Sequence, residues 1–321
     1  MRHVAIIVVN YRTAGLVLGC IDSLRKQDLN ATCHVYIVDN HSEDGSFEKI
    51  SQYVEEEGLA WVTVIAAERN GGFAYGNNIA LRRVAEGNRE ADYIWLLNPD
   101  TAVRKESCQI LVDHLDHGGV HIAGSRLEDE DGTPQVSHFN VPTIGTEFVS
   151  SLAIGLIERL SLKLRTRRDT VEQPEMCDWV SGSSMMFTRE LFERIGYMDE
   201  QYFLYFEELD YCLRAHRVGY PSWHVPDSRV VHYVGGATGI SDSRKQSPRR
   251  PTYWFDSRRR FFLKNYGAWK LIGADLAFIV GYSLFLLRKK LTGSDLSMQP
   301  PHFLRDLVRH SFLRRGFSLE G

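Results

Sequence analysis

The sequence lacks several features that mark particular classes of protein. It contains no Cys-x-x-Cys pair, and its five cysteines are scattered and odd in number. This pattern argues against a disulfide framework or a zinc cluster and suits a reducing cytosol. There is no internal repeat and no low-complexity segment, and the net charge of -3 gives no general attraction to nucleic acid.

The N-terminus also lacks the pattern of a secretory signal. Its apolar stretch is too short for the hydrophobic region of a signal peptide, and no small-residue cleavage site follows it. What is present is the composition of a soluble globular protein, with 43% hydrophobic and 25% charged residues. A chain of 321 residues can form one large domain or two smaller ones.

Two common phosphate-binding motifs are missing as well. No G-x-x-x-x-G-K-[ST] sequence occurs, which excludes the chemistry of P-loop proteins. The glycine-containing loop at 69–78 lacks the G-x-G-x-x-G spacing and follows the third predicted strand, so it is not a dinucleotide-binding fingerprint. Its glycines let the backbone approach a ligand closely, but a plain flexible connection is an equal alternative.

The first hundred residues alternate between strand and helix patterns. Because the connections are short, this alternation predicts βαβ units and a parallel sheet. We predict strands at 4–9, 35–40, 61–66 and 93–97, and helices at 16–24, 47–54 and 79–85.

The fourth of these strands ends on an acid. Residues 93–97 are apolar and aromatic, and Pro99 stops the strand because it lacks an N–H group. Asp100 then lies at the carboxyl end of a buried strand, where open α/β sheets bind ligands, and its carboxylate could hold a divalent cation against phosphate oxygens. The alternative is an ordinary Asn-Pro-Asp turn. Asn10 and Asp39 end two other strands and could face the same crevice.

After Asp100 the pattern is less regular. It predicts helices at 106–115 and 144–164, strands at 120–125 and 179–187, a short strand followed by a glycine turn at 229–236, and an acidic turn at 128–133. Trp179 could stack on a sugar or fill the core. His232 could complete a metal site with Asp100, or it could be an ordinary hydrogen-bonded core histidine.

An aromatic run at 202–206 leads into a helix that continues to about Val218 and carries three acids in its first turn, Glu207, Glu208 and Asp210. Acids at this position stabilise a helix through its dipole, and capping is one explanation of them. The other explanation is a general base, because a carboxylate among aromatic rings has its pKa raised by desolvation.

The C-terminal part has a different character. Arginines alternate with aromatic residues around 249–262, and 271–287 is strongly apolar but contains Asp275. Seventeen residues are fewer than the roughly 20 that span a bilayer. We therefore expect peripheral membrane contact through 249–290 near anionic headgroups, with a helical hairpin packed on the catalytic domain as the alternative.

Taken together in their order, these motifs resemble those of family-2 glycosyltransferases of the GT-A fold, and within that family the bacterial rhamnosyltransferase-like enzymes of cell-surface polysaccharide assembly. The resemblance covers roughly residues 3–265. It rests on Val9-Asn10-Tyr11, Val38-Asp39-Asn40 with Ser42 and Asp44-Gly45-Ser46, Asn70-x-Gly72-Phe73 with Asn77, Leu97-Asn98-Pro99-Asp100, Trp179-Val180-Ser181-Gly182, Phe206-Glu207-Glu208-Leu209-Asp210 with Leu213-Arg214, and His232.

The resemblance implies a GT-A, Rossmann-like mixed sheet flanked by helices. It implies a nucleotide-sugar-binding half at 1–100, an acceptor-binding and catalytic half of the same domain at 101–240, and a C-terminal helical extension at 241–321. It also implies a metal site at Asp100 and His232 for Mg²⁺ or Mn²⁺. Donor-binding residues would be Val9, Asn10, Tyr11, Asp39, Asn70, Gly72, Phe73, Asn77 and Asn98, and acceptor-binding residues Trp179 and Gly182.

Glu208 occupies the place of the family's catalytic aspartate, and Asn98 replaces the first acid of its D-x-D motif. The resemblance thus implies an inverting transferase with Glu208 as the base, and Glu207 or Asp210 as alternatives. We expect transfer of rhamnose from dTDP-rhamnose to a glycan or polyprenyl-diphosphate-linked acceptor, in the cytoplasm at the inner face of the membrane. A UDP-hexose transferase and a non-catalytic nucleotide-sugar-binding scaffold are the alternatives, and a nucleotidyltransferase is disfavoured because no glycine-rich triphosphate loop is present.

Overall fold

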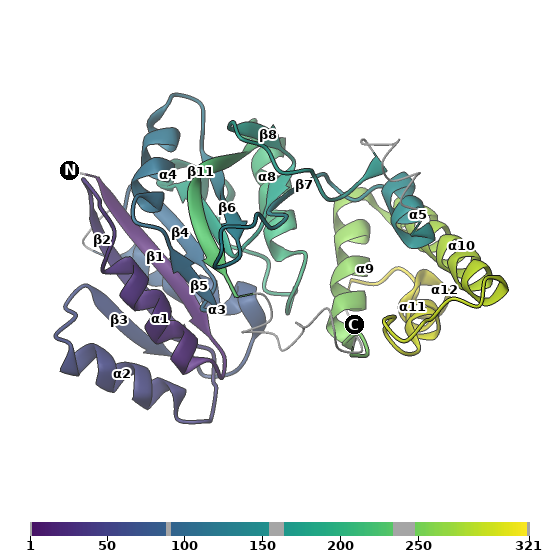
Figure 1. The fold of residues 1–321 in the computed structure, drawn as a ribbon, viewed down its shortest axis with the longest axis horizontal. Coiled ribbons are helices and arrows are strands. Elements are labelled where there is room, and N and C mark those ends of the chain that lie inside the picture. Colours follow the sequence, from purple (N-terminus) through teal and green to yellow (C-terminus); the bar gives the residue numbers. More distant parts are fainter. Residues whose placement is uncertain (1, 88–90, 154–163, 234–247, 320–321) are drawn as a thin grey trace. The chain divides into compact units, whose positions relative to one another are not determined.

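The computed structural model describes residues 2–87, 91–153, 164–233 and 248–319, and these divide into two compact units. The first unit comprises Met1–Phe139, Asp169–Phe203 and Glu207–Gly239, and the second comprises Asn140–Arg168, Leu204–Phe206 and Ile240–Gly321. Each unit is described by itself below (Figure 1).

The first unit contains all the named strands of the described chain and most of its helices. In chain order they are β1 (His3–Asn10), α1 (Ala14–Leu24), β2 (Thr32–Asp39), α2 (Ser46–Glu56), β3 (Val62–Ala66), α3 (Gly72–Glu86), β4 (Tyr93–Leu97), β5 (Thr101–Val103), α4 (Ser107–Asp116), β6 (Ile122–Glu128), β7 (His138–Phe139), β8 (Glu175–Cys177), β9 (Trp179–Val180), β10 (Ser184–Thr188), α7 (Arg189–Ile195), α8 (Glu207–Arg217) and β11 (Ser222–His232).

The central sheet is mixed. Its order is β3-β2-β1-β4-β10-β6-β11-β5, with β8 on β11 as the ninth strand. Strands β3, β2, β1 and β4 run parallel, whereas β10 runs antiparallel to both β4 and β6. All eight residues of β1 are buried, as expected for a continuous β-branched run covered on both faces. The four strands predicted in the first hundred residues are therefore confirmed.

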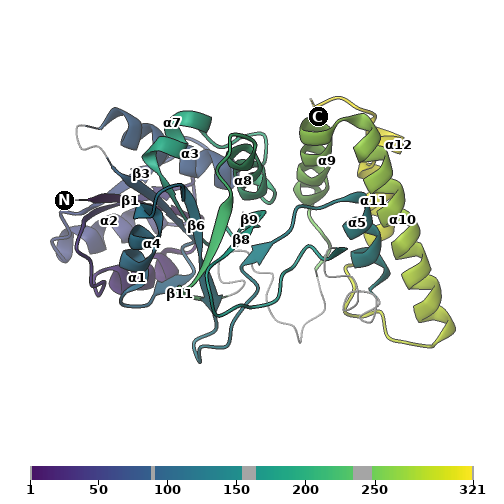
Figure 2. The same cartoon turned by 90° about the horizontal axis from the view of Figure 1, so that it is seen from above.

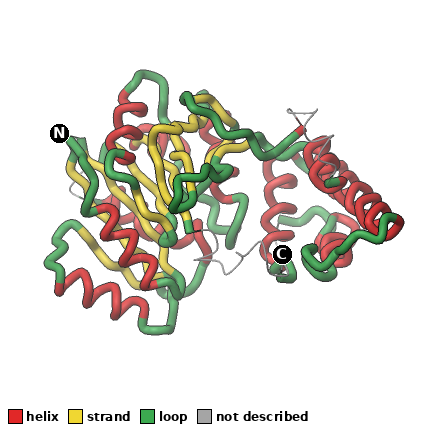
Figure 3. Tube along the Cα trace, in the orientation of Figure 1, coloured by secondary structure: helices red, strands yellow, loops and turns green. Residues whose placement is uncertain are grey.

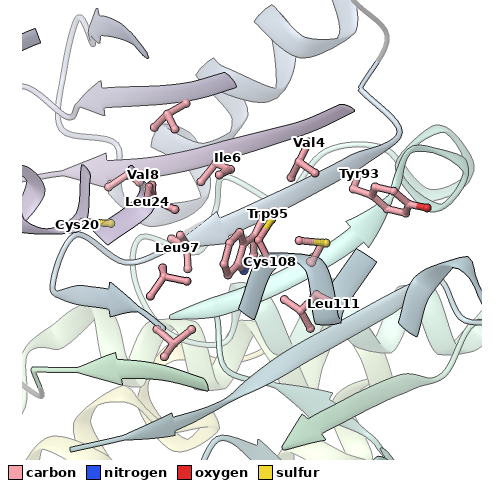
Figure 4. Close-up of a cluster of buried hydrophobic side chains, with 14 of the residues drawn as sticks. Val4, Ile6, Val8, Cys20, Leu24, Tyr93, Trp95, Leu97, Cys108 and Leu111 are labelled. Atoms are coloured by element: carbon pink, nitrogen blue, oxygen red, sulfur yellow. The ribbon is translucent and has the colours of Figure 1, made fainter. Parts of the chain in front are cut away.

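Helices cover both faces of this sheet, and β1 shows the division. Val4, Ile6 and Val8 pack in one hydrophobic cluster with residues of α1, α2 and α4, while Ala5 and Ile7 pack in another with residues of α3, α7 and α8. Figure 2 shows these two helical layers on either side of the strands, and Figure 4 shows the first cluster in close-up. The alternation follows from the two-residue period of a strand.

Two predictions in this unit are wrong. The segment 69–78 is not a loop throughout, because α3 begins at Gly72. Within this helix, Asn77 Nδ2 donates to the carbonyl oxygen of Phe73 at 2.9 Å, and the helix starts where it does because of a partner distant in sequence. Gly72 has φ +85°, and a Cβ there would lie 1.8 Å from the carbonyl oxygen of Phe203, so the close approach of these two backbones requires glycine.

The single strand predicted at 179–187 is also wrong. Strand β9 pairs with β7 in a separate two-stranded sheet, and β10 belongs to the central sheet. Between them, the Ser184 N–H donates to the Ser181 carbonyl at 3.3 Å, which makes a turn. Small residues allow this turn, and the apolar pattern on either side concealed it.

The named elements of the second unit are all helices (Figure 3). They are α5 (Ile144–Leu152), α9 (Thr252–Tyr266), α10 (Ala268–Leu291), α11 (Phe303–His310) and α12 (Phe312–Arg315). The helix predicted at 144–164 thus ends at Leu152, and its residues 154–163 lie outside the described part. Residues 234–236, where the strand predicted from Arg229 passes into a glycine turn, also lie outside it. Strand β11 begins earlier than predicted, at Ser222, because the run before Arg229 pairs with β6.

A buried ionic network holds the second unit together. Arg258 of α9 donates from Nε to Glu147 Oε2 of α5 at 2.7 Å and from Nη1 to Asp275 Oδ1 of α10 at 2.5 Å. Asp275 also accepts from the Phe312 backbone N–H at 2.9 Å. The acid inside the apolar run is therefore explained by its partners on neighbouring helices, and Arg258 and Arg259, which are both buried, are not free to meet headgroups.

Helix α10 is longer than the predicted 271–287 at both ends. By length and composition it could cross a membrane, and a third (33%) of its most apolar window is buried inside the structure.

Candidate active site

The carboxyl ends of β1 and β2 carry a buried polar cluster. Asn10 and Asp39 lie opposite each other in the parallel pairing, and Asn10 Nδ2 donates to Asp39 Oδ1 at 2.7 Å. The Ser42 hydroxyl donates to the same oxygen at 2.5 Å, and the Ser42 N–H donates to Asp39 Oδ2 at 3.1 Å. These bonds fix a carboxylate at the edge of the sheet where ligands bind in open α/β folds. The predicted neighbourhood of Asn10 and Asp39 is thus present.

The end of β2 is joined to the start of α3. Asn40 Nδ2 donates to Asn70 Oδ1 at 3.0 Å and to the Gly72 carbonyl at 3.1 Å. Helix α3 also lies close against β1, since a Cβ at Gly76 would lie 2.6 Å from Cγ1 of Val9. Phe73 follows Gly72, the glycine whose backbone approaches Phe203. The Phe73 N–H donates to the Phe203 carbonyl oxygen at 2.9 Å.

Beyond β4, four side chains meet. Asn98 Nδ2 donates to Ser183 Oγ at 2.9 Å, and Ser183 Oγ lies 3.4 Å from His232 Nε2. His232 Nε2 lies 3.5 Å from Asp100 Oδ1. Strand pairing explains the meeting, because β11 runs antiparallel to β5 with His232 opposite Thr101, the residue after Asp100. The predicted proximity of Asp100 and His232 is therefore present.

This pair suits a divalent cation that shares its ligands with a substrate. A carboxylate oxygen and an imidazole nitrogen are both accepted by manganese-like ions, and magnesium is held in many phosphate-binding sites by one or two carboxylates plus phosphate oxygens. In the described ranges no three or more His, Cys, Asp or Glu residues group around one point. The two side chains fit a metal ion whose remaining ligands come from a diphosphate and water.

Glu208 lies in the first turn of α8, beside Gly182. A Cβ at Gly182 would lie 3.5 Å from Cβ of Glu208 and 3.3 Å from Cε1 of Phe73, so the glycine leaves room between them. Burial raises the pKa of Glu208 to about 7, although backbone N–H groups, including those of Gly182 and Leu209, oppose the shift. Its Oε2 atom is buried and has no hydrogen-bond partner in the described part of the chain. Such a carboxylate can take up a proton at neutral pH.

The two neighbouring acids are in different environments. Asp210 is fully buried and accepts from Arg214 Nε at 3.2 Å and from the Tyr202 hydroxyl at 3.3 Å. Glu207 is also buried. Asp210 is thus engaged by two partners, whereas Glu208 combines a pKa raised to about 7 with a buried carboxylate oxygen, which are properties that suit proton transfer.

Two aromatic residues of the predicted site, Tyr11 and Trp179, have different surroundings. Tyr11 is exposed at 38% at the end of β1, and the guanidinium carbon of Arg12 lies 5.1 Å from the centroid of its ring. Trp179 stacks on Phe139, with ring centroids 4.1 Å apart and planes 15° apart. One face of the indole is therefore covered within the first unit.

The sequence did not reveal Ser183 or Gln135 as site residues. Ser183 bonds both Asn98 and His232, and Gln135 Oε1 lies 3.2 Å from His232 Nδ1. Ser183 lies in a run of small residues that suggested a strand centre, and Gln135 follows a turn far from any motif. A pocket of about 450 Å³ between the starts of α1 and α2 was also not foreseen; its lining includes Arg12 and Lys49.

Comparison with known proteins identifies the family of this chain. Residues 5–196 match the family model of Glycosyl transferase family 2, and the chain belongs to this family. A hexosyltransferase of low-salt glycan biosynthesis, Agl10 of Haloferax volcanii, is 28% identical over 266 residues, which are 83% of this chain and 76% of the relative. The N-acetylglucosaminyl-diphospho-decaprenol L-rhamnosyltransferase of Mycobacterium tuberculosis is 25% identical over 230 residues, 69% of this chain and 73% of the relative.

A solved structure agrees on the fold. The mannosyltransferase PcManGT of Pyrobaculum calidifontis, determined with GDP-Man and Mn²⁺, superposes with a TM-score of 0.55 at 16% identity, covering 97% of this chain and 86% of the other. The predicted GT-A fold, with helices flanking a mixed sheet and a C-terminal helical part, is confirmed. The protein is a glycosyltransferase.

Proposed function

We propose that this protein is an inverting, metal-dependent glycosyltransferase that moves rhamnose from dTDP-rhamnose to a glycan or polyprenyl-diphosphate-linked acceptor in cell-surface polysaccharide synthesis. The observation that carries the proposal is the position of Glu208, which borders Gly182, while the next residue, Ser183, contacts His232 beside Asp100. A candidate base and a candidate metal pair thus adjoin the same turn. The sugar and acceptor are supported by the M. tuberculosis relative, whose name gives an L-rhamnosyltransferase and a decaprenol-linked substrate.

The residues suggest the following division of labour. The Asn10–Asp39–Ser42 cluster and Tyr11 hold the nucleoside, and the start of α3 borders the diphosphate. Asp100 and His232 hold the divalent cation, which when bound supplies positive charge that offsets the charge on the departing nucleoside diphosphate. Gly182 and Trp179 border the acceptor.

Glu208 then acts as the general base. Its carboxylate takes the proton of the acceptor hydroxyl, the acceptor oxygen bonds to the anomeric carbon, and the bond from that carbon to the diphosphate oxygen breaks with its electron pair on the leaving group. Attack from the face opposite the leaving group inverts the anomeric centre, and one base suffices because no covalent intermediate forms. A carboxylate with pKa near 7 is well matched to this role at neutral pH.

The direct test is a transfer assay with Mn²⁺, a panel of dTDP-, UDP- and GDP-sugars, and a synthetic N-acetylglucosaminyl-diphospho-polyprenol acceptor. We expect a rhamnosylated product with inverted configuration from dTDP-rhamnose alone. Turnover with a UDP-hexose instead would replace the donor assignment. Donor binding without transfer or hydrolysis of any donor would favour the non-catalytic scaffold.

A lipid-linked acceptor implies work at the cytoplasmic face of the membrane, and α10 offers a surface for that contact. At about 100° per residue, six exposed apolar side chains of this helix fall within an arc of about 80°. They are Trp269, Leu276, Val280, Leu284, Leu287 and Leu291. Three cations, Arg288, Lys289 and Lys290, occupy its last turn. An apolar stripe with a basic end suits a helix lying in the interface of an anionic bilayer.

Vesicle sedimentation tests this contact. The wild-type protein should sediment with vesicles containing phosphatidylglycerol and much less with pure phosphatidylcholine, and a Leu284→Ser/Leu287→Ser variant should lose most of the binding. Met176→Ser is the matched control, because Met176 is an exposed apolar residue (56%) of the first unit. Equal sedimentation of the α10 variant and wild type would contradict the assignment, and resistance of the bound protein to alkaline carbonate would indicate a spanning helix instead.

A further inference from the structure

The Gln135 side chain contacts both the backbone and the imidazole ring of His232. Its amide nitrogen Nε2 donates to the His232 carbonyl oxygen at 2.9 Å and to Asp129 Oδ1 at 2.6 Å. Its amide oxygen Oε1 lies 3.2 Å from His232 Nδ1. The Gln135 backbone is itself anchored, because its N–H donates to the Leu127 carbonyl of β6 at 2.8 Å.

These contacts determine which way the amide faces. A carbonyl oxygen and an ionised carboxylate oxygen can only accept hydrogen bonds, so the group that meets both of them must be the amide nitrogen. The amide oxygen is then the atom that faces His232 Nδ1. Because that oxygen can only accept, Nδ1 must carry a hydrogen.

The hydrogen on Nδ1 determines what the other ring nitrogen of His232, Nε2, can bind. In a neutral imidazole with a hydrogen on Nδ1, Nε2 presents a lone pair. Here Nε2 faces Asp100 Oδ1 at 3.5 Å, which is also an electron-pair donor, with the Ser183 hydroxyl at 3.4 Å. Two electron-pair donors that face a common space are arranged for a cation between them.

We propose that Gln135 is a positioning residue for the divalent cation: it holds His232 in the Nδ1–H tautomer, so that Nε2 joins Asp100 as a metal ligand. Metal-bound histidines commonly donate their second N–H to a carbonyl or carboxylate oxygen, and loss of that partner weakens metal binding 10- to 100-fold. The inference rests on the proposed function, because it assumes the divalent cation of the transfer reaction. It assigns a role to a residue that follows the turn at 128–133 and belongs to none of the sequence motifs.

The test measures Mn²⁺ binding rather than turnover. The free-Mn²⁺ electron paramagnetic resonance signal, recorded with the full-length protein and dTDP, gives the affinity without a sugar being transferred. Gln135→Met keeps the length of the side chain and removes both hydrogen-bonding groups, and it should weaken Mn²⁺ binding 10- to 100-fold. Gln109→Met is the matched control, since Gln109 is partly exposed and its side chain bonds to Asp113 at 2.6 Å and to the Asn30 N–H at 2.8 Å.

A double-mutant comparison separates positioning from a general structural effect. If Gln135 acts through His232, adding Gln135→Met to His232→Ala should cause no further loss of Mn²⁺ affinity. Nitrogen-15 spectra should also show the Nδ1–H tautomer of His232 in wild type and a tautomer mixture in Gln135→Met, with His232→Ala identifying the signal. An equal further loss in the His232→Ala background, unchanged affinity in Gln135→Met, or wild type that binds no Mn²⁺ with dTDP would each overturn the proposal.

Failure here is distinguishable from failure of the proposed function. Mn²⁺ affinity that depends on Gln135, combined with an absence of transfer, would overturn the function and leave the positioning role standing. Transfer that depends on Mn²⁺, combined with unchanged Mn²⁺ affinity in Gln135→Met, would overturn the positioning role and leave the proposed function standing.

Discussion

His232 Nε2 lies 3.5 Å from Asp100 Oδ1, and the pairing of β11 with β5 brings the two residues together from distant parts of the chain. The Tyr233 N–H also donates to the Asp100 carbonyl at 2.9 Å, so the backbones are joined on both sides of the pair. The separation of the two side chains is therefore set by a strand register rather than by flexible loops, which is the support that a metal site needs.

Removal of Asp100 should weaken donor binding that depends on metal. Asp100→Ala deletes one of the two proposed protein ligands, so dTDP-sugar affinity in Mn²⁺ should fall by at least about tenfold and approach that of wild type in EDTA. Isothermal titration with and without EDTA measures both. Asp227→Ala is the control, because Asp227 is exposed on β11. Full metal-dependent affinity in Asp100→Ala would count against the metal pair.

Glu208→Gln should separate binding from chemistry. The amide keeps the size of the side chain but cannot take a proton, so donor binding should persist while kcat falls by about 10²–10⁴. A coupled assay of nucleoside diphosphate release with a saturating acceptor gives kcat. Glu55→Gln in α2, an exposed position, should match wild type. Wild-type turnover in Glu208→Gln would show that another group acts as the base.

The raised pKa of Glu208 also predicts a pH dependence of stability. Folding lifts this pKa from 4.5 to about 7, so the folded protein binds more protons than the unfolded chain between these values. Its contribution to the free energy of unfolding therefore decreases as pH rises from about 4.5 to 7, by roughly 1–3 kcal/mol. The ionised form of Glu208, which the proposed mechanism requires, is therefore the form in which the folded protein is less stable.

Urea unfolding at pH 5 and pH 8 checks this. The Glu208→Gln variant has no titrating group at position 208, so its stability relative to wild type should increase between the two pH values. The logarithm of wild-type kcat/KM should rise with pH, bend near pH 7 and level off above it, because the base must be ionised. A stability difference between variant and wild type that is the same at both pH values would refute the burial effect.

Gly72→Ala should damage the start of α3. The added Cβ would lie 1.8 Å from the Phe203 carbonyl oxygen, at a φ of +85° that side chains rarely adopt. Backbone strain of about 1–3 kcal/mol plus the clash should lower the melting temperature and weaken donor binding. Gly118→Ala is the control, since no atom lies within 4 Å of its added Cβ and its φ is not positive. Equal melting temperatures for the two variants would show that the backbone around Gly72 and Phe203 can move apart without a loss of stability.

Arg258→Ala should destabilise the helical unit strongly. It leaves the carboxylates of Glu147 and Asp275 buried without their shared cation, and breaking a buried pair in this way costs about 3–5 kcal/mol. Guanidinium unfolding followed by circular dichroism measures the loss. Arg305→Ala on the exposed side of α11 is the control. Replacing all three members, as Glu147→Gln/Arg258→Met/Asp275→Asn, should cost less than Arg258→Ala alone, because no unpaired charge remains.

Much of the fold followed from local pattern. Strand β4 has the predicted bounds, because an apolar run closed by Pro99 permits little else. Strand β1 was equally clear from its β-branched run. The start of α3 and the break between β9 and β10 were missed, because Gly72 and the serines after Val180 are shaped by partners distant in sequence: Phe203, Asn98 and His232.

The sequence by itself determined the order of strands and helices in the first hundred residues and the family motifs that place Asp39, Asp100 and Glu208 at element ends. Those features depend on neighbours within a few residues, such as a strand that stops at a proline or a helix that starts with acids. Tertiary structure alone decided that Gln135 faces Nδ1 of His232 and that Asp275 is buried against Arg258, and it decided which acid in the first turn of α8 has its pKa raised to about 7 by burial, namely Glu208. Each of these depends on which atoms of distant segments come within a few ångströms, because hydrogen bonding and desolvation act only at that range.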